Sequence, residues 1–336
     1  MRQWWYLYNI DRQEVAEGLS GELAEFLFNV TPLSTPGGHA ALLSSIRTPC
    51  LPKEVDTWMT GGRTVIQSHG FRKLPLEIFD MVMDQLQWME LFVLALTCKD
   101  ILSALRSRLL TVLKELHAPW RNCPLILLGR NTAQHNGLPT SIHLTSHQRA
   151  KIMNGAIRRY GEHTDSYTYA LGRTDPLYHL RRHIPKGLRD AGRSGRGSWR
   201  STSTSTIGDC QRFCVLWGSG APVCYPDGTP VLCNVSKAEY VRADGLTAPD
   251  VTLAHALLVR IAWSTDTSTG FPCADGVAQA LTSGPWAGDK VSVDTMETLP
   301  TLPLGRREEG WVDVTSEVNW LLWNLWTASH QQDHGA

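Results

Sequence analysis

Cysteines, histidines and glycine-rich loops are the features of this 336-residue sequence that could carry chemistry, and their spacing limits what they could do. The twelve histidines form no HExxH pattern, and the sequence contains neither GxSxG nor the Gly-x4-Gly-Lys-Ser/Thr phosphate loop. Four of the eight cysteines lie near one another, but three, nine and eight residues separate them, whereas structural zinc sites favour C-x2-C pairs. We therefore expect neither a metal nor a cofactor; the cysteines concerned are Cys210, Cys214, Cys224 and Cys233.

Two other patterns have common structural explanations. GRSGRGS (192–198) is rich in glycine, but no predicted strand precedes it and no predicted helix follows, which makes it a poor phosphate cradle. Asp266 and Asp289 end the elements WSTD and WAGD, and aspartate forms turns and helix caps more often than it binds a ligand. With no catalytic constellation in view, we expect a non-enzymatic protein; a hydrolase or transferase within 116–330 is the enzyme alternative.

The composition indicates a globular chain whose charge points to no particular partner. The 32 Lys and Arg residues balance the 32 Asp and Glu residues, so net charge favours neither nucleic acid nor a membrane surface. No apolar run approaches the roughly 18 residues that span a bilayer, and the N-terminus lacks the apolar core of a signal peptide. We expect a cytoplasmic or nuclear protein. Most of its 13 tryptophans, including the stripe at 320, 323 and 326, are expected in the core.

Hydrophobic periodicity predicts an α+β fold. Residues 4–10 (WWYLYNI) are too aromatic to be left in water, and a lone strand is unstable, so we expect them to pair with strands beyond Cys210. Further strands are predicted at 124–129 and 290–295, and helices at 19–29, 145–160, 251–263 and 313–328.

Composition also divides the chain into segments. Residues 181–206 are basic and rich in glycine and serine, so they cannot bury enough apolar surface to offset the entropy of ordering. We expect this segment to be a disordered linker. The other segments are an N-terminal strand and helix packing on the C-terminal region (1–30), a Pro/Gly/Ser-rich loop with one short helix near 40–45 (31–70), a helical unit (71–115), and the two parts of the C-terminal region (116–180 and 207–330).

The most apolar helices of the chain lie between Leu74 and Cys98, in LPLEIFDMVMDQLQWMELFVLALTC. Pro75 suits the first turn of a helix, where its missing N–H is not needed, and Glu77 lies near the positive end of the helix dipole. Apolar residues then recur at helical spacing through two short helices, and a third begins at Ile101. A unit of under about 40 residues seldom encloses a core by itself, so we expect one face to stay apolar for a partner.

This stretch resembles the F-box motif, in which Leu-Pro-x-Glu and a hydrophobic residue are followed by spaced leucines and a cysteine. The match runs without gaps over 25 residues, and only Trp88–Met89 departs from the polar turn that the family often has there. The resemblance implies docking on the Skp-type adaptor of a cullin–RING ubiquitin ligase. The adaptor contacts that it implies are Leu74, Pro75, Glu77, Ile78, Val82, Leu86, Leu91, Leu94 and Cys98.

The layout outside this stretch is similar to that of a group of fungal F-box-like proteins. The shared elements, in order, are WWYLYNID and SGELAEFLF before the F-box, and NVSKAEYVR, WSTD and WAGD after it. The resemblance implies a non-catalytic receptor whose remaining chain binds a protein substrate. Two alternatives remain open: an F-box-like scaffold acting outside any ligase, and helices that are simply the core of a helical domain.

Overall fold

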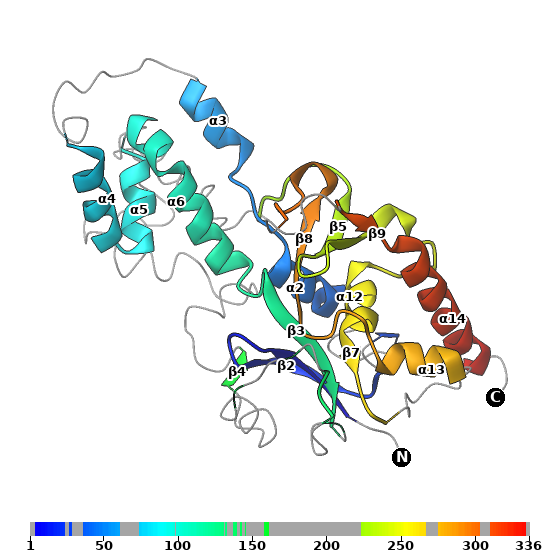
Figure 1. Cartoon of the computed structure of the whole chain (residues 1–336). Coiled ribbons are helices and arrows are strands. Elements are labelled where there is room, and N and C mark those ends of the chain that lie inside the picture. The colour runs from blue at the N-terminus through cyan, green and yellow to red at the C-terminus, as the bar shows by residue number, and fades with distance from the viewer. Residues whose placement is uncertain are drawn as a thin grey trace, which may run out of the picture. The chain divides into compact units, whose positions relative to one another are not determined.

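The computed structural model describes residues 4–23, 27–28, 36–60, 74–97, 99–130, 132, 137–139, 142, 145, 158–160, 223–266, 275–302 and 310–333. These residues fall into two compact units. Unit 1 lies within Met1–Thr48, Ala118–Tyr167 and Pro226–Ala336, and unit 2 lies within Pro49–His117 and Thr168–Tyr225. Unit 1 combines a sheet with helices and the described part of unit 2 is helical, so the predicted α+β class is confirmed (Figure 1).

Unit 1 is built on one mixed sheet, which contains nine strands in the described part of the chain. The strand order is β4-β2-β1-β3-β8-β5-β6-β9, and β7 pairs with β3 beside this path (Figure 1). The strands are β1 (Trp5–Asn9), β2 (Glu14–Gly21), β3 (Cys123–Gly129), β4 (Arg158–Tyr160), β5 (Pro230–Asn234), β6 (Glu239–Arg242), β7 (Ala262–Trp263), β8 (Asp289–Thr295) and β9 (Val312–Asp313).

Strand β3 shows why the segment PLILLG can be apolar at every position. Successive side chains of a strand point to opposite faces of the sheet. Leu125 and Leu127 join the main core of unit 1, whereas Ile126 and Leu128 join a second, smaller apolar cluster. Both faces of β3 are therefore covered, which is the situation that favours a continuous apolar run. The buried strand predicted at 124–129 is confirmed.

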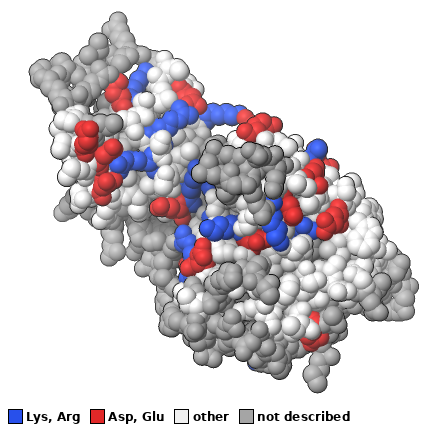
Figure 2. Space-filling model, viewed as in Figure 1, with Lys and Arg blue, Asp and Glu red and all other residues white. Residues whose placement is uncertain are grey.

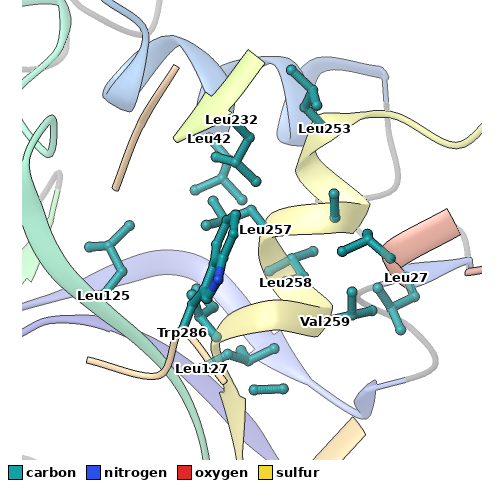
Figure 3. Close-up of a cluster of buried hydrophobic side chains, with 14 of the residues drawn as sticks. Leu27, Leu42, Leu125, Leu127, Leu232, Leu253, Leu257, Leu258, Val259 and Trp286 are labelled. Atoms are coloured by element: carbon teal, nitrogen blue, oxygen red, sulfur yellow. The ribbon is translucent and has the colours of Figure 1, made fainter. Parts of the chain in front are cut away.

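The main core of unit 1 is organised around helix α12 (Leu253–Ile261), which is buried along its whole length. Leu257 and Leu258 project from α12 into a cluster that also holds Leu125 of β3 and Trp286 (Figure 3). This packing confirms the apolar helix predicted within 251–263. The other helices described in unit 1 are α2 (Pro36–Ile46), α13 (Asp275–Thr282) and α14 (Thr315–Asp333), with short 3-10 turns η3 (Ala243–Gly245) and η4 (Met296–Thr298).

The N-terminal strand joins the C-terminal sheet through neighbours other than those predicted. β1 pairs antiparallel with β2 and β3, so the prediction of direct pairing beyond Cys210 is wrong. β3 in turn pairs with β7 and β8, and the two ends of the chain therefore do share one sheet. The reason is that β3 supplies a partner as apolar as β1 itself, in register from Trp5 opposite Gly129 to Asn9 opposite Leu125.

Three other predicted segments differ in the structure. The helix predicted at 19–29 is wrong at its start, because β2 continues to Gly21 in pairing with β1. The helix predicted at 145–160 is wrong at its end, where β4 pairs with β2, and most of that segment lies outside the described residues. The loop predicted at 31–70 contains α2 and a further helix, α3 (Lys53–Thr60). The linker predicted at 181–206 lies outside the described residues.

The two segments that connect unit 1 to residues 49–117 are held at one point of the sheet. The Thr48 hydroxyl donates to the Asp294 carboxylate at the end of β8, and the Arg121 guanidinium donates to the same hydroxyl. Arg121 also lies 3.5 Å from Asp294, and the Trp120 N–H donates to the Ser45 carbonyl over 2.9 Å. The chain therefore leaves and re-enters unit 1 at neighbouring positions.

This geometry predicts that unit 1 folds without the inserted helices. We expect a variant in which residues 50–116 are replaced by a Gly/Ser linker of about eight residues to keep a cooperative urea transition and near-ultraviolet circular dichroism. The change in the free energy of unfolding should be within about 1 kcal/mol, because loop closure costs depend only weakly on length. Loss of the near-ultraviolet signal with retained far-ultraviolet signal would show instead that unit 1 needs the insertion for its packing.

Candidate docking surface on the helical unit

Unit 2 consists, in its described part, of four helices with a core of their own. They are α3, α4 (Leu76–Gln85), α5 (Trp88–Ala95) and α6 (Lys99–His117). The three helices predicted within 71–115 are α4, α5 and α6; α3 adds Val55, which is fully buried. The remaining buried residues of this core are Phe79, Met83, Leu91, Phe92, Ala95, Ile101, Leu102, Leu105, Leu109 and Leu113.

The turn between α4 and α5 is where the sequence departs from the F-box pattern. Leu86 ends α4 in an extended conformation, and Gln87 caps the start of α5. The Gln87 N–H donates to the Glu90 carboxylate over 2.8 Å, as one half of a capping box. Trp88 is half-buried against the core of unit 2. The capping box therefore supplies the polar turn, and Trp88 in place of a polar residue adds packing.

One face of α4 and its entry is apolar and exposed. Leu74, Ile78, Met81 and Val82 are 37%, 43%, 64% and 38% exposed, respectively. Met81 and Val82 follow Ile78 by three and four residues, so both are its neighbours on one side of the helix. We call these four residues the α4 stripe. The prediction that this face stays exposed in the free chain is confirmed for Leu74, Ile78 and Val82.

The opposite side of α4 holds the helix onto the unit. Phe79 and Met83, four residues apart, are 8% and 1% exposed within the internal core. Helix α4 is thus apolar on two sides, one facing its own core and one facing outward. A helix of this kind is typical of a segment that binds a partner after its unit has folded.

Two ion pairs to α6 fix the rotation of α4 about its axis. Arg108 lies 3.0 Å from Asp80 and 2.5 Å from Asp84, which are four residues apart on α4. The hydrogen bond to Asp84 raises the pKa of the Arg108 guanidinium, so it stays charged. These side chains are partly exposed, and each pair contributes at most about 1 kcal/mol. Their effect is to present the α4 stripe in a fixed direction.

The predicted adaptor contacts divide into a surface group and a core group. Leu91 is only 7% exposed, and Leu86 and Leu94 are half-buried against the same internal core. Truncating these three leucines would therefore act first on the stability of unit 2. Cys98 lies outside the described residues. The surface group is Leu74, Pro75, Glu77, Ile78 and Val82.

Two exposed apolar residues were not among the predicted contacts. Met81 is 64% exposed within the α4 stripe, and Val93 of α5 is 54% exposed. Met81 could have been found, because it lies three residues after Ile78 on the same helical face. For Val93 no such signal exists, since α5 is apolar at every position except Glu90 and its buried face is set by contact with α6.

Other kinds of site find little support in the described part of the molecule. No group of three or more His, Cys, Asp or Glu side chains among the described residues is placed to hold a metal ion. Cys233 is buried in β5, and burial raises the pKa of its thiol, while Cys210 and Cys214 lie outside the described residues. On the described surface visible in Figure 2, basic side chains lie beside acidic ones. No described helix has the length and apolarity to cross a membrane.

Comparison with known proteins adds no relative: no family model, no curated protein and no solved structure matches the chain.

Proposed function

We propose that the chain is an F-box protein that docks on a Skp-type adaptor and thereby joins a cullin-based ubiquitin ligase. One observation carries the proposal: residues of an ungapped F-box-like motif form the exposed α4 stripe of a folded helical unit. Leu74, Ile78 and Val82 are motif positions and are also among the apolar side chains that unit 2 leaves outside its core. A residue's position in the motif does not determine its exposure, yet these three motif residues are also exposed.

The energetics of the α4 stripe suit a docking helix. Burying one leucine, isoleucine or valine side chain stabilises a complex by roughly 1.5–3 kcal/mol. Amphipathic helices bind grooves through anchors at positions i, i+3, i+4 and i+7. Ile78, Met81 and Val82 of α4 stand at positions i, i+3 and i+4 of this spacing, and Leu74 lies four residues before Ile78 at the entry of the helix. The adaptor is expected to supply the matching apolar groove.

In this proposal unit 1 serves as the substrate-binding part of a non-catalytic receptor. The substrate is a protein, the working compartment is the cytoplasm or nucleus, and the cullin is reached only through the adaptor. The absence of a recognisable catalytic motif in the sequence agrees with a receptor role. The runner-up is a scaffold that uses the same α4 stripe outside any ligase.

The test is binding of purified full-length chain to a Skp-type adaptor by isothermal titration calorimetry. We expect the double variant Ile78→Ala/Val82→Ala to bind the adaptor at least about tenfold more weakly than the wild type, because two anchors are truncated. Leu74→Ala/Pro75→Ala should weaken binding similarly. All four positions are exposed, so circular dichroism should show the fold unchanged.

Val312→Ala is the matched control, since Val312 is 52% exposed but lies in unit 1. It should bind the adaptor like the wild type. Undiminished binding by both double variants would contradict docking through the α4 stripe. No adaptor binding by the wild type would contradict the ligase proposal, and adaptor binding without cullin recruitment would favour the scaffold.

A further inference from the structure

A groove of about 610 Å³ lies on unit 1 at the start of α14. Its walls come from the end of β6, from η3, from β9 and from the first turns of α14. The volume falls in the range typical of ligand pockets and exceeds what a single side chain fills. The lining residues that matter below are Arg242, Asp313, Asn319, Trp320 and Trp323.

Two tryptophans of α14 face this groove instead of the core. Trp320 is 58% exposed and Trp323 is 36% exposed, so the expectation of a buried tryptophan stripe is wrong for both. The core side of α14 is taken by Val318, Leu321, Leu322 and Leu325. Large exposed indole rings are costly in water and are enriched among the residues that dominate binding energy at interfaces.

Contacts within unit 1 hold the Trp323 ring of the groove in place without a ligand. The Trp323 indole N–H donates to the Thr247 hydroxyl over 2.7 Å, and the ring meets Trp326 edge-on at 5.4 Å. Asn319 accepts the Thr247 N–H over 2.9 Å and donates to its hydroxyl over 3.1 Å. Because these contacts fix the Trp323 ring in advance, a ligand that contacts this ring loses less conformational entropy on binding.

The groove has a net negative charge, because acidic side chains outnumber basic ones in and beside it. Arg242 is engaged by Asp244 through two hydrogen bonds of 2.9 and 2.6 Å, so its charge is offset. Asp313 is exposed, accepts the Thr315 N–H over 2.9 Å, is hydrogen-bonded to the Tyr240 side chain and interacts electrostatically with Arg242. Glu317, in the first turn of α14, is paired with Arg260. Arg242 offsets one of the two carboxylates near it, Asp244 and Asp313, so the groove keeps a net charge of one carboxylate.

We propose that this groove binds an extended peptide segment that carries an arginine. A guanidinium stacks on an indole face and binds a carboxylate through two parallel hydrogen bonds, which matches Trp320 beside Asp313. Arg242 and Ser316 also line the groove and carry N–H and O–H donors for the carbonyl groups of a peptide backbone. The inference is independent of the ligase proposal, because every residue involved belongs to unit 1 and its test needs no adaptor.

Fluorescence anisotropy with the full-length chain and labelled Gly-Ser-Arg-Gly-Ser peptide tests the proposal. Matched peptides carry lysine, glutamate or alanine at the central position. We expect the arginine peptide to bind most tightly, the lysine peptide more weakly, and the glutamate peptide not at all. Binding of the arginine peptide should weaken with added salt, because the groove is open to solvent.

Variants then assign the binding to the groove. Trp320→Ala and Asp313→Asn should each weaken arginine-peptide binding by about three- to tenfold. Asparagine still accepts the Thr315 N–H, so the start of α14 is preserved. The controls are Trp4→Ala, where Trp4 is 49% exposed on the same unit, and Asp11→Asn in the exposed turn after β1. Equal binding of the alanine or glutamate peptide, no binding of the arginine peptide, or binding untouched by Trp320→Ala would overturn the proposal.

Discussion

Replacing Asp294 with alanine is expected to lower the free energy of unfolding of unit 1 by about 3 kcal/mol. Asp294 is 3% exposed, accepts the Ser292 hydroxyl over 2.5 Å and the Thr48 hydroxyl, and lies 3.5 Å from Arg121. Alanine removes the carboxylate but leaves a mostly buried guanidinium and two hydroxyls without their acceptor. Urea unfolding followed by circular dichroism measures the loss.

Two comparisons separate this buried charge from ordinary ion pairing. Asp244→Ala removes an ion pair of similar chemistry on the exposed surface of the same unit, and should leave the transition nearly where it is. The double variant Arg121→Met/Asp294→Leu removes both charges and should recover part of the loss, because no unpaired charge is then buried. If Asp294→Ala were as stable as the wild type, the Arg121 guanidinium would have to hydrogen-bond water or another acceptor in that variant.

The Asp294 cluster also explains how a helical insertion can be accommodated. Thr48 and Arg121 lie at the two ends of the segment 49–117, and both bond to the same position on β8. Fixing both ends at one point makes the sheet insensitive to what lies between them. The Asp294 cluster therefore links two predictions: loss of stability in Asp294→Ala, and a stable unit 1 after replacement of residues 50–116.

Elements that bury apolar side chains over most of their surface could be located from the sequence. The runs around β3 and α12 have few alternatives to burial, and the structure confirms both. By contrast β2 (EVAEGLSG) and α3 (KEVDTWMT) were not predicted. β2 is stabilised by pairing with β1, and α3 by packing of Val55 on the other helices of unit 2. Neither interaction is visible in the local sequence.

The docking surface could be predicted only in part for a similar reason. The spacing of Ile78 and Val82 identifies a helix face, and the resemblance to the F-box motif predicts that this face is exposed. Burial of Leu91 depends on how α5 meets α6, which no periodicity within α5 reveals, because that helix is apolar at every position except Glu90. The same limit applies to Trp320, where residue type suggested burial but one side of α14 already fills the core.

The stability of unit 1 is expected to fall by about 3 kcal/mol between pH 6.5 and pH 4 because of His255. Burial, with a smaller contribution from His39, lowers the pKa of His255 from 6.5 to about 4. The ring lies 4.4 Å from His39 and 5.8 Å from Phe28, and its Nδ1 accepts the Thr252 N–H over 3.0 Å at the start of α12. A proton on Nδ1 would break this cap and place a charge in the core.

The sign of this pH dependence follows from the pKa of His255 in the folded and the unfolded chain. The unfolded chain takes up a proton on His255 near pH 6.5, whereas the folded chain does so only near pH 4. Stability is therefore fully present above pH 6.5 and is lost as the pH falls through that window. Urea unfolding at several pH values should show a shallower slope for His255→Asn, which can still accept the Thr252 N–H but does not titrate. His39→Gln should also reduce the slope, since His39 contributes to lowering the pKa of His255. Equal slopes in the wild type and His255→Asn would assign the pH dependence to other groups.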